Sequence, residues 1–282
     1  MSEADAGQIG TLAMRDGAEL HYRHYAASHP RGVVVAVHGI RSHSGWYVAS
    51  CAHLARAGFE VFFPDRRGSG LNRHARGDVT HAETFIDDLA EVVAEVRRRL
   101  PGVPVHLEAI SWGAKLVCAT LIRLRDLARS VMLVGPGLAS RIDVTPGVKL
   151  RIALALAVKS TARFDVPLAD ARLFTDTPER VRYIADDPLS LRRCTARLLY
   201  ATRRLDRFVR AHAHALKTPM CVMLAGRDRI VDNAGVRRIC GRFASQPVEI
   251  IEYPDAAHTL EFEPEPTAIF DDMVAWLERM SD

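Results

Sequence analysis

Apolar and polar residues follow one another along the chain in a pattern that predicts strands and helices in turn. Short apolar runs, such as GVVVAV at 32–37, are typical of strands that are buried on both faces of a parallel sheet. We expect strands at 32–37, 60–64, 103–110, 130–134, 220–224 and 248–253, after two antiparallel strands at 11–14 and 19–25. Helical spacing of apolar residues predicts helices at 44–57, 84–100, 114–124, 233–243 and 266–280. The predicted fold class is α/β, with a mostly parallel eight-stranded sheet flanked by helices.

This alternation stops between residues 140 and 217. The stretch has no clear buried strand, and prolines at 167, 178 and 188 interrupt it. Two of its segments, 151–159 and 192–216, have helical patterns. We therefore expect a core formed by residues 1–139 and 218–282, with a helical cap at 140–217 inserted after the sixth strand.

Composition is that of an ordinary globular protein: 282 residues, of which 48% are hydrophobic and 26% charged, with a formal net charge of +4. So mild a charge favours neither nucleic acid nor a strongly acidic partner. The five cysteines are scattered without a C-x-x-C pair, which is typical of reduced thiols and not of a metal site. The first residues lack a signal-peptide pattern and no apolar run is long enough to span a bilayer, so we expect a cytoplasmic protein.

A serine joins a predicted strand to a predicted helix in the segment 103–116, VPVHLEAISWGAKL. Small residues, Ala109 and Gly113, stand two positions before and two positions after Ser111. A nucleophilic serine on such a turn has a strained backbone that exposes its Oγ, and its neighbours must be small because the helix folds back against the strand. A serine between small residues can also be an ordinary helix N-cap, so the pattern alone leaves both interpretations open.

Two further residues with suitable chemistry follow the two strands expected after the insertion. Reactive groups gather beyond the carboxyl ends of parallel strands, and Asp228 and His258 both lie at such ends. His258 would take the proton of Ser111 and later protonate the leaving group, while Asp228 would hold His258 in the correct tautomer. Asp232 is a rival acid, but it resembles the N-cap of the next helix, so we favour Asp228.

A serine nucleophile also requires backbone N–H groups that stabilise the oxyanion of the intermediate. Trp112, at the start of the predicted helix, is one expected donor. The second is Ile40 in the sequence His38-Gly39-Ile40, which follows the first buried strand, because Gly39 lets the backbone turn closely. A plain tight turn at His38-Gly39 is the alternative.

Glu108 is unusual because it lies in a strand that should be central and buried, three residues before Ser111. A buried carboxylate needs a partner or a raised pKa. We expect a paired structural residue, with a role in tuning the site as the alternative.

Together these residues resemble the α/β-hydrolase family, in particular its monoacylglycerol lipase and lysophospholipase branch, over nearly the whole chain. Residues 38–47, HGIRSHSGWY, are similar to the HG-x-x-x-HSG-x-Y segment of that branch, and DRRGSG at 65–70 is similar to its D-x-x-G-x-G turn. The D-P-L at 187–189 is similar to a motif of its cap, and 224–228 and 257–258 match its acid and base positions.

The resemblance implies the α/β-hydrolase fold with a cap domain, and a catalytic triad of Ser111, Asp228 and His258. It also implies Ile40 and Trp112 as the oxyanion-hole amides, and no metal or other cofactor. Three departures from the family pattern bear on specificity. Ala109 replaces the first elbow glycine, Glu108 replaces an apolar residue, and the bulky Trp112 could crowd the acyl pocket.

The expected function is that of a serine hydrolase cleaving carboxylic esters, such as monoacylglycerols or lysophospholipids, through an acyl-enzyme. The partner would be a small-molecule ester with an apolar acyl part, and not nucleic acid. The same triad could instead serve acyl transfer or the cleavage of thioesters, amides or lactones. A non-catalytic small-molecule binder is the alternative from another class.

Two features of the insertion bear on contact with lipid. The segment 150–158, LRIALALAV, could face an acyl chain or a lipid surface, but we favour a helix packed on the sheet. A basic stretch is expected to be a solvated helix face, with attraction to anionic lipid as the alternative. It consists of Arg192, Arg193, Arg197, Arg203, Arg204, Arg207 and Arg210.

Overall fold

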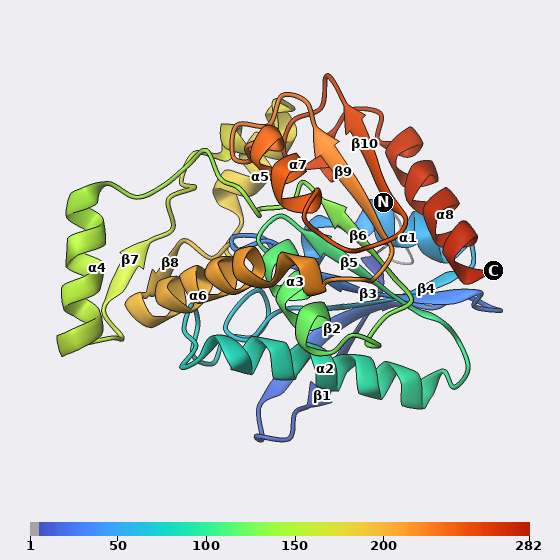
Figure 1. Cartoon of the computed structure of the whole chain (residues 1–282), viewed down its shortest axis with the longest axis horizontal. Coiled ribbons are helices and arrows are strands. Elements are labelled where there is room, and N and C mark those ends of the chain that lie inside the picture. Colours follow the sequence, from blue (N-terminus) through green and yellow to red (C-terminus); the bar gives the residue numbers. More distant parts are fainter. Residues whose placement is uncertain (1–5) are drawn as a thin grey trace.

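The computed structural model describes residues 6–282, which are organised around an eight-stranded sheet (Figure 1). The strand order is β1-β2-β4-β3-β5-β6-β9-β10, and only the pairs that include β2 are antiparallel within this described sheet. The strands are β1 (Gln8–Ala13), β2 (Glu19–Tyr25), β3 (Gly32–Val37), β4 (Phe59–Pro64), β5 (Val105–Ile110), β6 (Ser130–Val134), β9 (Met220–Ala225) and β10 (Val248–Tyr253). The predicted α/β fold with a mostly parallel sheet is confirmed.

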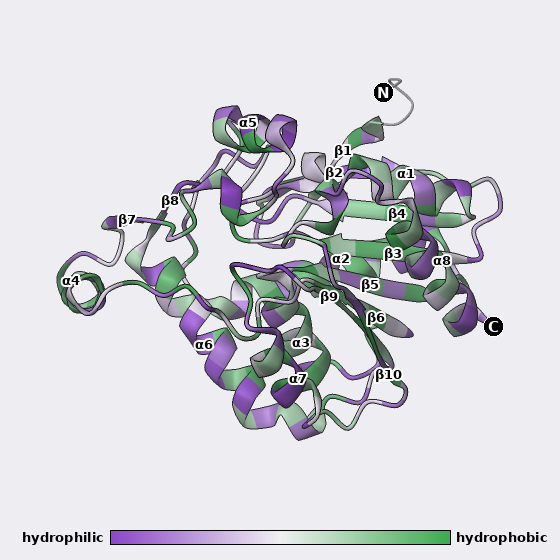
Figure 2. Cartoon of the chain, turned by 90° about the horizontal axis from the view of Figure 1, so that it is seen from above, coloured by the Kyte–Doolittle hydropathy of each residue, from purple (hydrophilic) through white to green (hydrophobic). Residues whose placement is uncertain are grey.

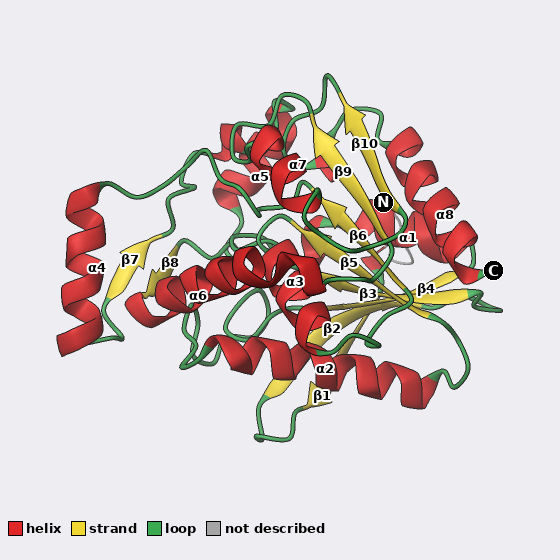
Figure 3. Ribbon diagram, in the orientation of Figure 1, coloured by secondary structure: helices red, strands yellow, loops and turns green. Residues whose placement is uncertain are grey.

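The central strands are apolar because both of their faces are covered. Every residue of β3, β4, β5, β6 and β9 is buried. Helices α1 (Val48–Arg56) and α8 (Thr267–Ser281) cover one face of the sheet, and α2 (Ala82–Arg99), α3 (Gly113–Arg123) and α7 (Asn233–Cys240) cover the other (Figures 2 and 3). The predicted helix at 44–57 is divided into a short 3-10 helix, η2 (Ser44–Trp46), and α1.

Residues 140–217 leave the sheet after β6 and return to it at β9. They form α4 (Pro146–Val158), β7 (Arg163–Asp165), α5 (Pro178–Asp186), β8 (Arg193–Thr195) and α6 (Ala196–His212). β7 and β8 pair with each other in a separate antiparallel sheet. Neither strand was predicted, because three residues are too few to set an alternating pattern.

A buried hydrogen-bond network joins this insertion to the loop after β3. Oδ2 of Asp187 accepts hydrogen bonds from Nε1 of Trp46 (2.8 Å) and Oγ of Ser190 (3.0 Å), and lies 3.1 Å from Nε2 of His43. The D-P-L motif at 187–189 therefore has a structural role, because its carboxylate ties the insertion to the HSG-x-Y segment.

α4 contradicts the favoured prediction that the apolar segment 150–158 packs on the sheet. None of the residues of this described helix is buried, and in both orientations it lies at the outer end of the molecule, beside α6 (Figures 1 and 2). Leu150, Leu154 and Val158 are 63%, 59% and 87% exposed. Because they are four residues apart, they form one apolar stripe on the helix surface.

The basic stretch is solvated as predicted: six of its seven arginines are exposed, and Arg197 is half-buried. Five of its seven arginines contact other parts of the chain: Arg192 with Ala185 O, Arg193 with Asp165, Arg197 with Asp78, Arg204 with Glu83 and Arg210 with Leu138 O. The contacts of Arg197, Arg204 and Arg210 join α6 to the core, whereas those of Arg192 and Arg193 stay within the insertion.

Candidate active site

Ser111 lies at the sharp turn between β5 and α3. Its backbone φ is +52°, in the left-handed region that side chains rarely adopt. The turn brings α3 so close to β3 that a Cβ atom added to Gly113 would lie 2.3 Å from the carbonyl oxygen of Val37. This contact explains why the position two residues after Ser111 must be glycine, and why Ser111 projects at the carboxyl edge of the sheet.

The structure brings Ser111, His258 and Asp228 together in one hydrogen-bonded row. Oγ of Ser111 lies 3.0 Å from Nε2 of His258, and Nδ1 of the same ring lies 2.7 Å from Oδ2 of Asp228. The side chains of His258 and Asp228 are almost fully buried. The imidazole is thus positioned to accept a proton from the hydroxyl, with a carboxylate behind it.

The loop after β9 fixes the orientation of Asp228. Its Oδ1 accepts hydrogen bonds from the backbone N–H groups of Ile230 and Val231, both at 2.7 Å, which leaves Oδ2 for His258. The rival, Asp232, is the N-cap residue of α7 as expected, although its side chain makes no capping hydrogen bond. Asp228, and not Asp232, is the carboxylate in contact with the imidazole.

The direction of the Trp112 N–H is set by the peptide group that joins Ser111 to Trp112, because the carbonyl oxygen of that group is held in place. The oxygen of Ser111 accepts hydrogen bonds from the N–H groups of Gly137 (2.8 Å) and Ala114 (3.1 Å). In a planar trans peptide the N–H points away from the carbonyl, so the Trp112 N–H points to the opposite side. Among the described residues it has no hydrogen-bond acceptor.

The same logic applies to Ile40. The oxygen of Gly39 lies 2.8 Å from Nδ1 of His38 and accepts a hydrogen bond of 2.8 Å from the Arg66 guanidinium. The imidazole is fixed in turn, because its Nε2 accepts the N–H of Arg66 (2.9 Å). The Ile40 N–H therefore points away from this buried cluster, and no acceptor for it exists within residues 6–282.

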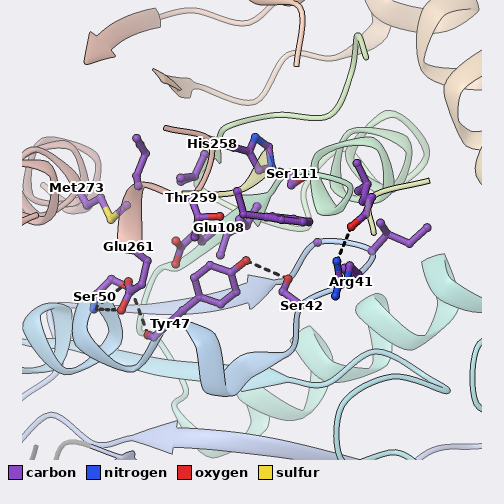
Figure 4. A pocket seen from close by; sticks show the side chains of 17 residues that line it. Arg41, Ser42, Tyr47, Ser50, Glu108, Ser111, His258, Thr259, Glu261 and Met273 are labelled. Atoms are coloured by element: carbon purple, nitrogen blue, oxygen red, sulfur yellow. Dashed lines mark hydrogen bonds between the residues drawn. The ribbon is translucent and has the colours of Figure 1, made fainter. Parts of the chain in front are cut away.

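A pocket opens next to Ser111 and His258 (Figure 4). Most of its apolar lining comes from the core, and Leu168 and Phe174 come from the insertion. The Phe174 ring meets the His258 ring edge-on at 5.9 Å between centroids. The insertion thus covers the reactive groups and provides part of the surface that a substrate would contact.

Comparison with known proteins identifies the family. A family model described as serine aminopeptidase, S33 (Hydrolase_4) matches residues 28–265. The chain belongs to this family. A monoacylglycerol lipase of Mycolicibacterium smegmatis is 29% identical over 249 residues, which are 88% of each chain. The predicted enzyme class, a carboxylic ester hydrolase of the monoacylglycerol lipase-like branch, is supported by such relatives.

Solved structures agree on the fold of this hydrolase. The monoacylglycerol lipase of Paleococcus ferrophilus superposes with a TM-score of 0.83 at 23% identity, covering 93% of this chain and 99% of its own. A soluble variant of the Saccharomyces cerevisiae monoglyceride lipase, in complex with a substrate analogue, gives 0.86 at 20% identity and covers 98% and 96%. These likenesses confirm the α/β-hydrolase fold.

The indole of Trp112 does not crowd the pocket of the hydrolase, contrary to the concern raised by its size. It lies outside the lining residues and contacts Phe85 of α2 and Thr202 of α6. Its Nε1 donates a hydrogen bond to Oγ1 of Thr202 (3.1 Å), and the Arg66 guanidinium lies 4.4 Å above its ring. The large side chain therefore links the elbow to the insertion, while only its N–H faces the reacting groups.

The prediction of a paired structural role for Glu108 is wrong. Its side chain lines the pocket, and its buried Oε2 has no hydrogen-bond partner among the described residues. Burial, with a smaller contribution from the nearby carboxylate of Glu261, raises the pKa of Glu108 to about 8. Glu261 could not be found from the sequence as the neighbour of Glu108, because it lies three residues after His258 and no pattern connects the two glutamates.

Proposed function

We propose that this hydrolase cleaves carboxylic esters through an acyl-enzyme on Ser111. His258 acts as general base and then as general acid, and Asp228 orients the imidazole and stabilises its cation. The observation that carries this proposal is the hydrogen-bonded row Asp228–His258–Ser111 at the positive-φ turn.

In the first step Oγ of Ser111 attacks the ester carbonyl while Nε2 of His258 takes the hydroxyl proton. The carbonyl oxygen becomes an anion, for which the free N–H groups of Ile40 and Trp112 are the proposed donors. The protonated imidazole then gives its proton to the leaving alcohol, and the acyl group stays on Ser111. Water, deprotonated by the same imidazole, releases the carboxylic acid and restores the enzyme.

The proposed substrates have an apolar acyl part, as in a monoacylglycerol or a lysophospholipid. Seven apolar side chains line the pocket: Ile40, Ile110, Val134, Leu168, Phe174, Leu260 and Met273. The relatives named as monoacylglycerol lipases point to the same class. We infer that residues 140–217 act as the cap of this site, since Leu168 and Phe174 belong to that segment.

An ester panel combined with active-site labelling tests the proposal. We expect hydrolysis of esters with apolar acyl chains, little hydrolysis of the matched amides, and one covalent adduct of a fluorophosphonate probe, located on Ser111 by peptide mass spectrometry. Inactivity toward every ester together with no labelling would instead support a non-catalytic binder. Faster cleavage of the amides than of the esters would indicate a peptidase instead of an esterase.

The exposed stripe of α4 supports a second proposal, that the cap rests on a lipid surface. Large exposed apolar groups on one helix face are typical of peripheral membrane contact, and Lys149, Arg151 and Lys159 stand beside the stripe. None of the described helices is long and apolar enough to cross a membrane.

We expect the double substitution Leu150→Ser and Leu154→Ser to lower the partition coefficient onto vesicles by about 100-fold. Each leucine contributes roughly 1.5–3 kcal/mol when it leaves water, and 1.4 kcal/mol is a factor of ten. Vesicle flotation measures the effect. Leu124→Ser is the matched control, because Leu124 is also exposed (41%) but lies at the end of α3. Equal flotation of all three proteins would exclude α4 as the contact.

A further inference from the structure

Polar side chains gather in one part of the pocket, below Ser111 in Figure 4. Side chains of five residues form this region, which we call the carboxyl floor: Ser42, Tyr47, Ser50, Glu108 and Glu261 (Figure 4). Three of them already have partners, since Tyr47 donates to Ser42 Oγ (2.9 Å) and Ser50 donates to the Tyr47 carbonyl oxygen (3.2 Å). The two carboxyl groups differ from each other in how they are satisfied.

Glu261 is held by the start of α1. It lies in the 3-10 helix η5 (Leu260–Phe262), and its Oε1 accepts the N–H groups of Ala49 (2.8 Å) and Ser50 (3.3 Å). No side chain of the N-cap residue of α1 fills this role, so Glu261 replaces it from a distant part of the chain. The free amides of a helix N-terminus stabilise a carboxylate, so Glu261 is a built-in acceptor.

Glu108, in contrast, has no partner of its own. Its side chain is 2% exposed, projects from the centre of β5 into the pocket, and makes no hydrogen bond within residues 6–282. A buried polar atom without a partner is rare in native proteins, because leaving it unsatisfied is costly. A group with this cost, next to a nucleophile, is the expected sign of a ligand contact.

The ligand that fits is a cation. No ion pair joins Glu108 or Glu261 to a basic side chain in the described part of the chain, although the buried Arg41 lines the same pocket. Two neighbouring carboxyl groups therefore share one pocket without a direct cationic partner. A metal ion is a poor fit, because no third His, Cys, Asp or Glu of residues 6–282 completes a ligand set there. An ammonium group supplies both the positive charge and N–H donors in a small volume.

We propose that the carboxyl floor binds an ammonium group carried by the alcohol part of the ester substrate, with Glu108 accepting its N–H donors. This rests on the proposed function for the position of the ester. With the carbonyl carbon at Ser111 and the acyl chain among the apolar side chains, the alcohol part extends toward Glu108. Hydrolysis consumes one water and gives a carboxylic acid and an amino alcohol.

The two glutamates of the carboxyl floor avoid a double negative charge by holding protons. Burial raises the pKa of Glu108 to about 8 and that of Glu261 to about 7. Burial also raises the pKa of Tyr47, which is therefore neutral at these pH values. The other ionisable residues of the lining are His258 of the catalytic row and Arg41, whose guanidinium donates to the carbonyl oxygens of Leu168 and Ala169. Outside the lining, the nearby Arg180 lowers the pKa of Glu261. Binding of a cation should release protons from the two glutamates.

Direct binding of n-propylammonium chloride to the wild-type protein tests the proposal without requiring turnover. Saturation-transfer NMR at pH 8.5 would give its affinity, with 1-propanol as the neutral comparison of similar size. We expect the ammonium ion to bind at least tenfold more tightly than the alcohol. Equal binding, or tighter binding of the alcohol, would overturn the proposal with no substitution needed.

Two variants locate the site. Glu108→Gln keeps the size of the side chain but removes its charge, and should lower the affinity for n-propylammonium at least tenfold. Glu60→Gln is the matched control, because Glu60 is also buried (7% exposed) but pairs with His24 on the far side of β4 and does not line the pocket. A loss in the control as large as that in Glu108→Gln would refute the assignment.

The pH dependence adds an independent check. At pH 6 both glutamates hold protons, and above pH 8 they are charged, while an alkylammonium ion keeps its proton to about pH 10. We therefore expect the affinity to rise at least tenfold between pH 6 and pH 9 in the wild type, and to lose most of this rise in Glu108→Gln. An affinity independent of pH would contradict binding to these carboxyl groups.

A pair of isosteric esters separates this proposal from the proposed function. 2-(Dimethylamino)ethyl butanoate, whose tertiary amine cannot accept the acyl group, is compared with 3-methylbutyl butanoate. We expect a ratio of kcat/KM of at least ten in favour of the amine, falling toward one in Glu108→Gln. Hydrolysis of both esters at equal rates would contradict the ammonium site, while the proposed esterase function would stand. If neither ester is hydrolysed but n-propylammonium still binds through Glu108, the ammonium site stands and the proposed esterase function fails.

Discussion

Ser111→Ala is expected to lower kcat for ester hydrolysis by about 10⁴-fold or more. The substitution removes the only atom that can form the acyl-enzyme in the proposed mechanism, and the residual rate would come from the oxyanion amides and substrate binding alone. Stability should change little, since alanine has the same difficulty as serine at a φ of +52°. Ester turnover and the unfolding midpoint, measured on the same preparations, check both statements.

Ser69→Ala is the matched control for this experiment. Ser69 is fully buried, its Oγ has no partner in the described structure, and it does not line the pocket. Removing an unsatisfied hydroxyl group costs little, so kcat should stay within about twofold of the wild type. Substantial activity in Ser111→Ala, or an equal loss in Ser69→Ala, would contradict a nucleophilic role for Ser111.

The central sheet was predictable because its strands are buried on both faces. The predicted bounds of β3 and β6, which are fully buried, agree with the structure residue for residue. A continuous apolar run of five or six residues between polar segments is typical of a strand that is buried on both faces of a sheet. The ends of the helices were less accurate, as with α1, since a 3-10 turn and an α-helix have similar apolar spacing.

The environment of an apolar helix could not be predicted in the same way. Apolar residues lie on every side of α4, and such a sequence does not tell which side is covered. The choice depends on where the flanking loops hold the helix, and here they hold it beyond α6, away from the sheet. The prediction of packing on the sheet was wrong for that reason.

At the candidate site, the sequence predicted the residues whose position depends on local geometry. It did not predict the contacts between residues that are distant in the chain. Three features could be predicted because each one directly follows a strand: the turn at Ser111, the N–H of Trp112 and the acid after β9. The partners of Glu108 do not, because Glu261 reaches it from a segment that is remote in sequence. The sequence correctly marked Glu108 as unusual, but only the fold reveals that its neighbour has the same charge.

Asp228→Asn should cost about 10⁴-fold in kcat, whereas Asp232→Asn should stay within about twofold of the wild type. In the wild type Oδ1 of Asp228 accepts two backbone N–H groups, which leaves Oδ2 to accept the Nδ1–H of His258. The asparagine oxygen would take the place of Oδ1, so its NH₂ group would face the ring. Nδ1 would then have to accept a hydrogen bond, and the ring proton would move to Nε2.

In that tautomer Nε2 cannot take the proton of Ser111, so the variant would fold normally but lose its general base. Steady-state kinetics together with the unfolding midpoints of both variants would separate this effect from misfolding. A large loss in Asp232→Asn, with activity retained in Asp228→Asn, would reverse the assignment of the acid. Both residues lie close together after β9, but only Asp228 contacts the imidazole. A difference between the two variants therefore reports the hydrogen bond to Nδ1 and not a general effect on this part of the chain.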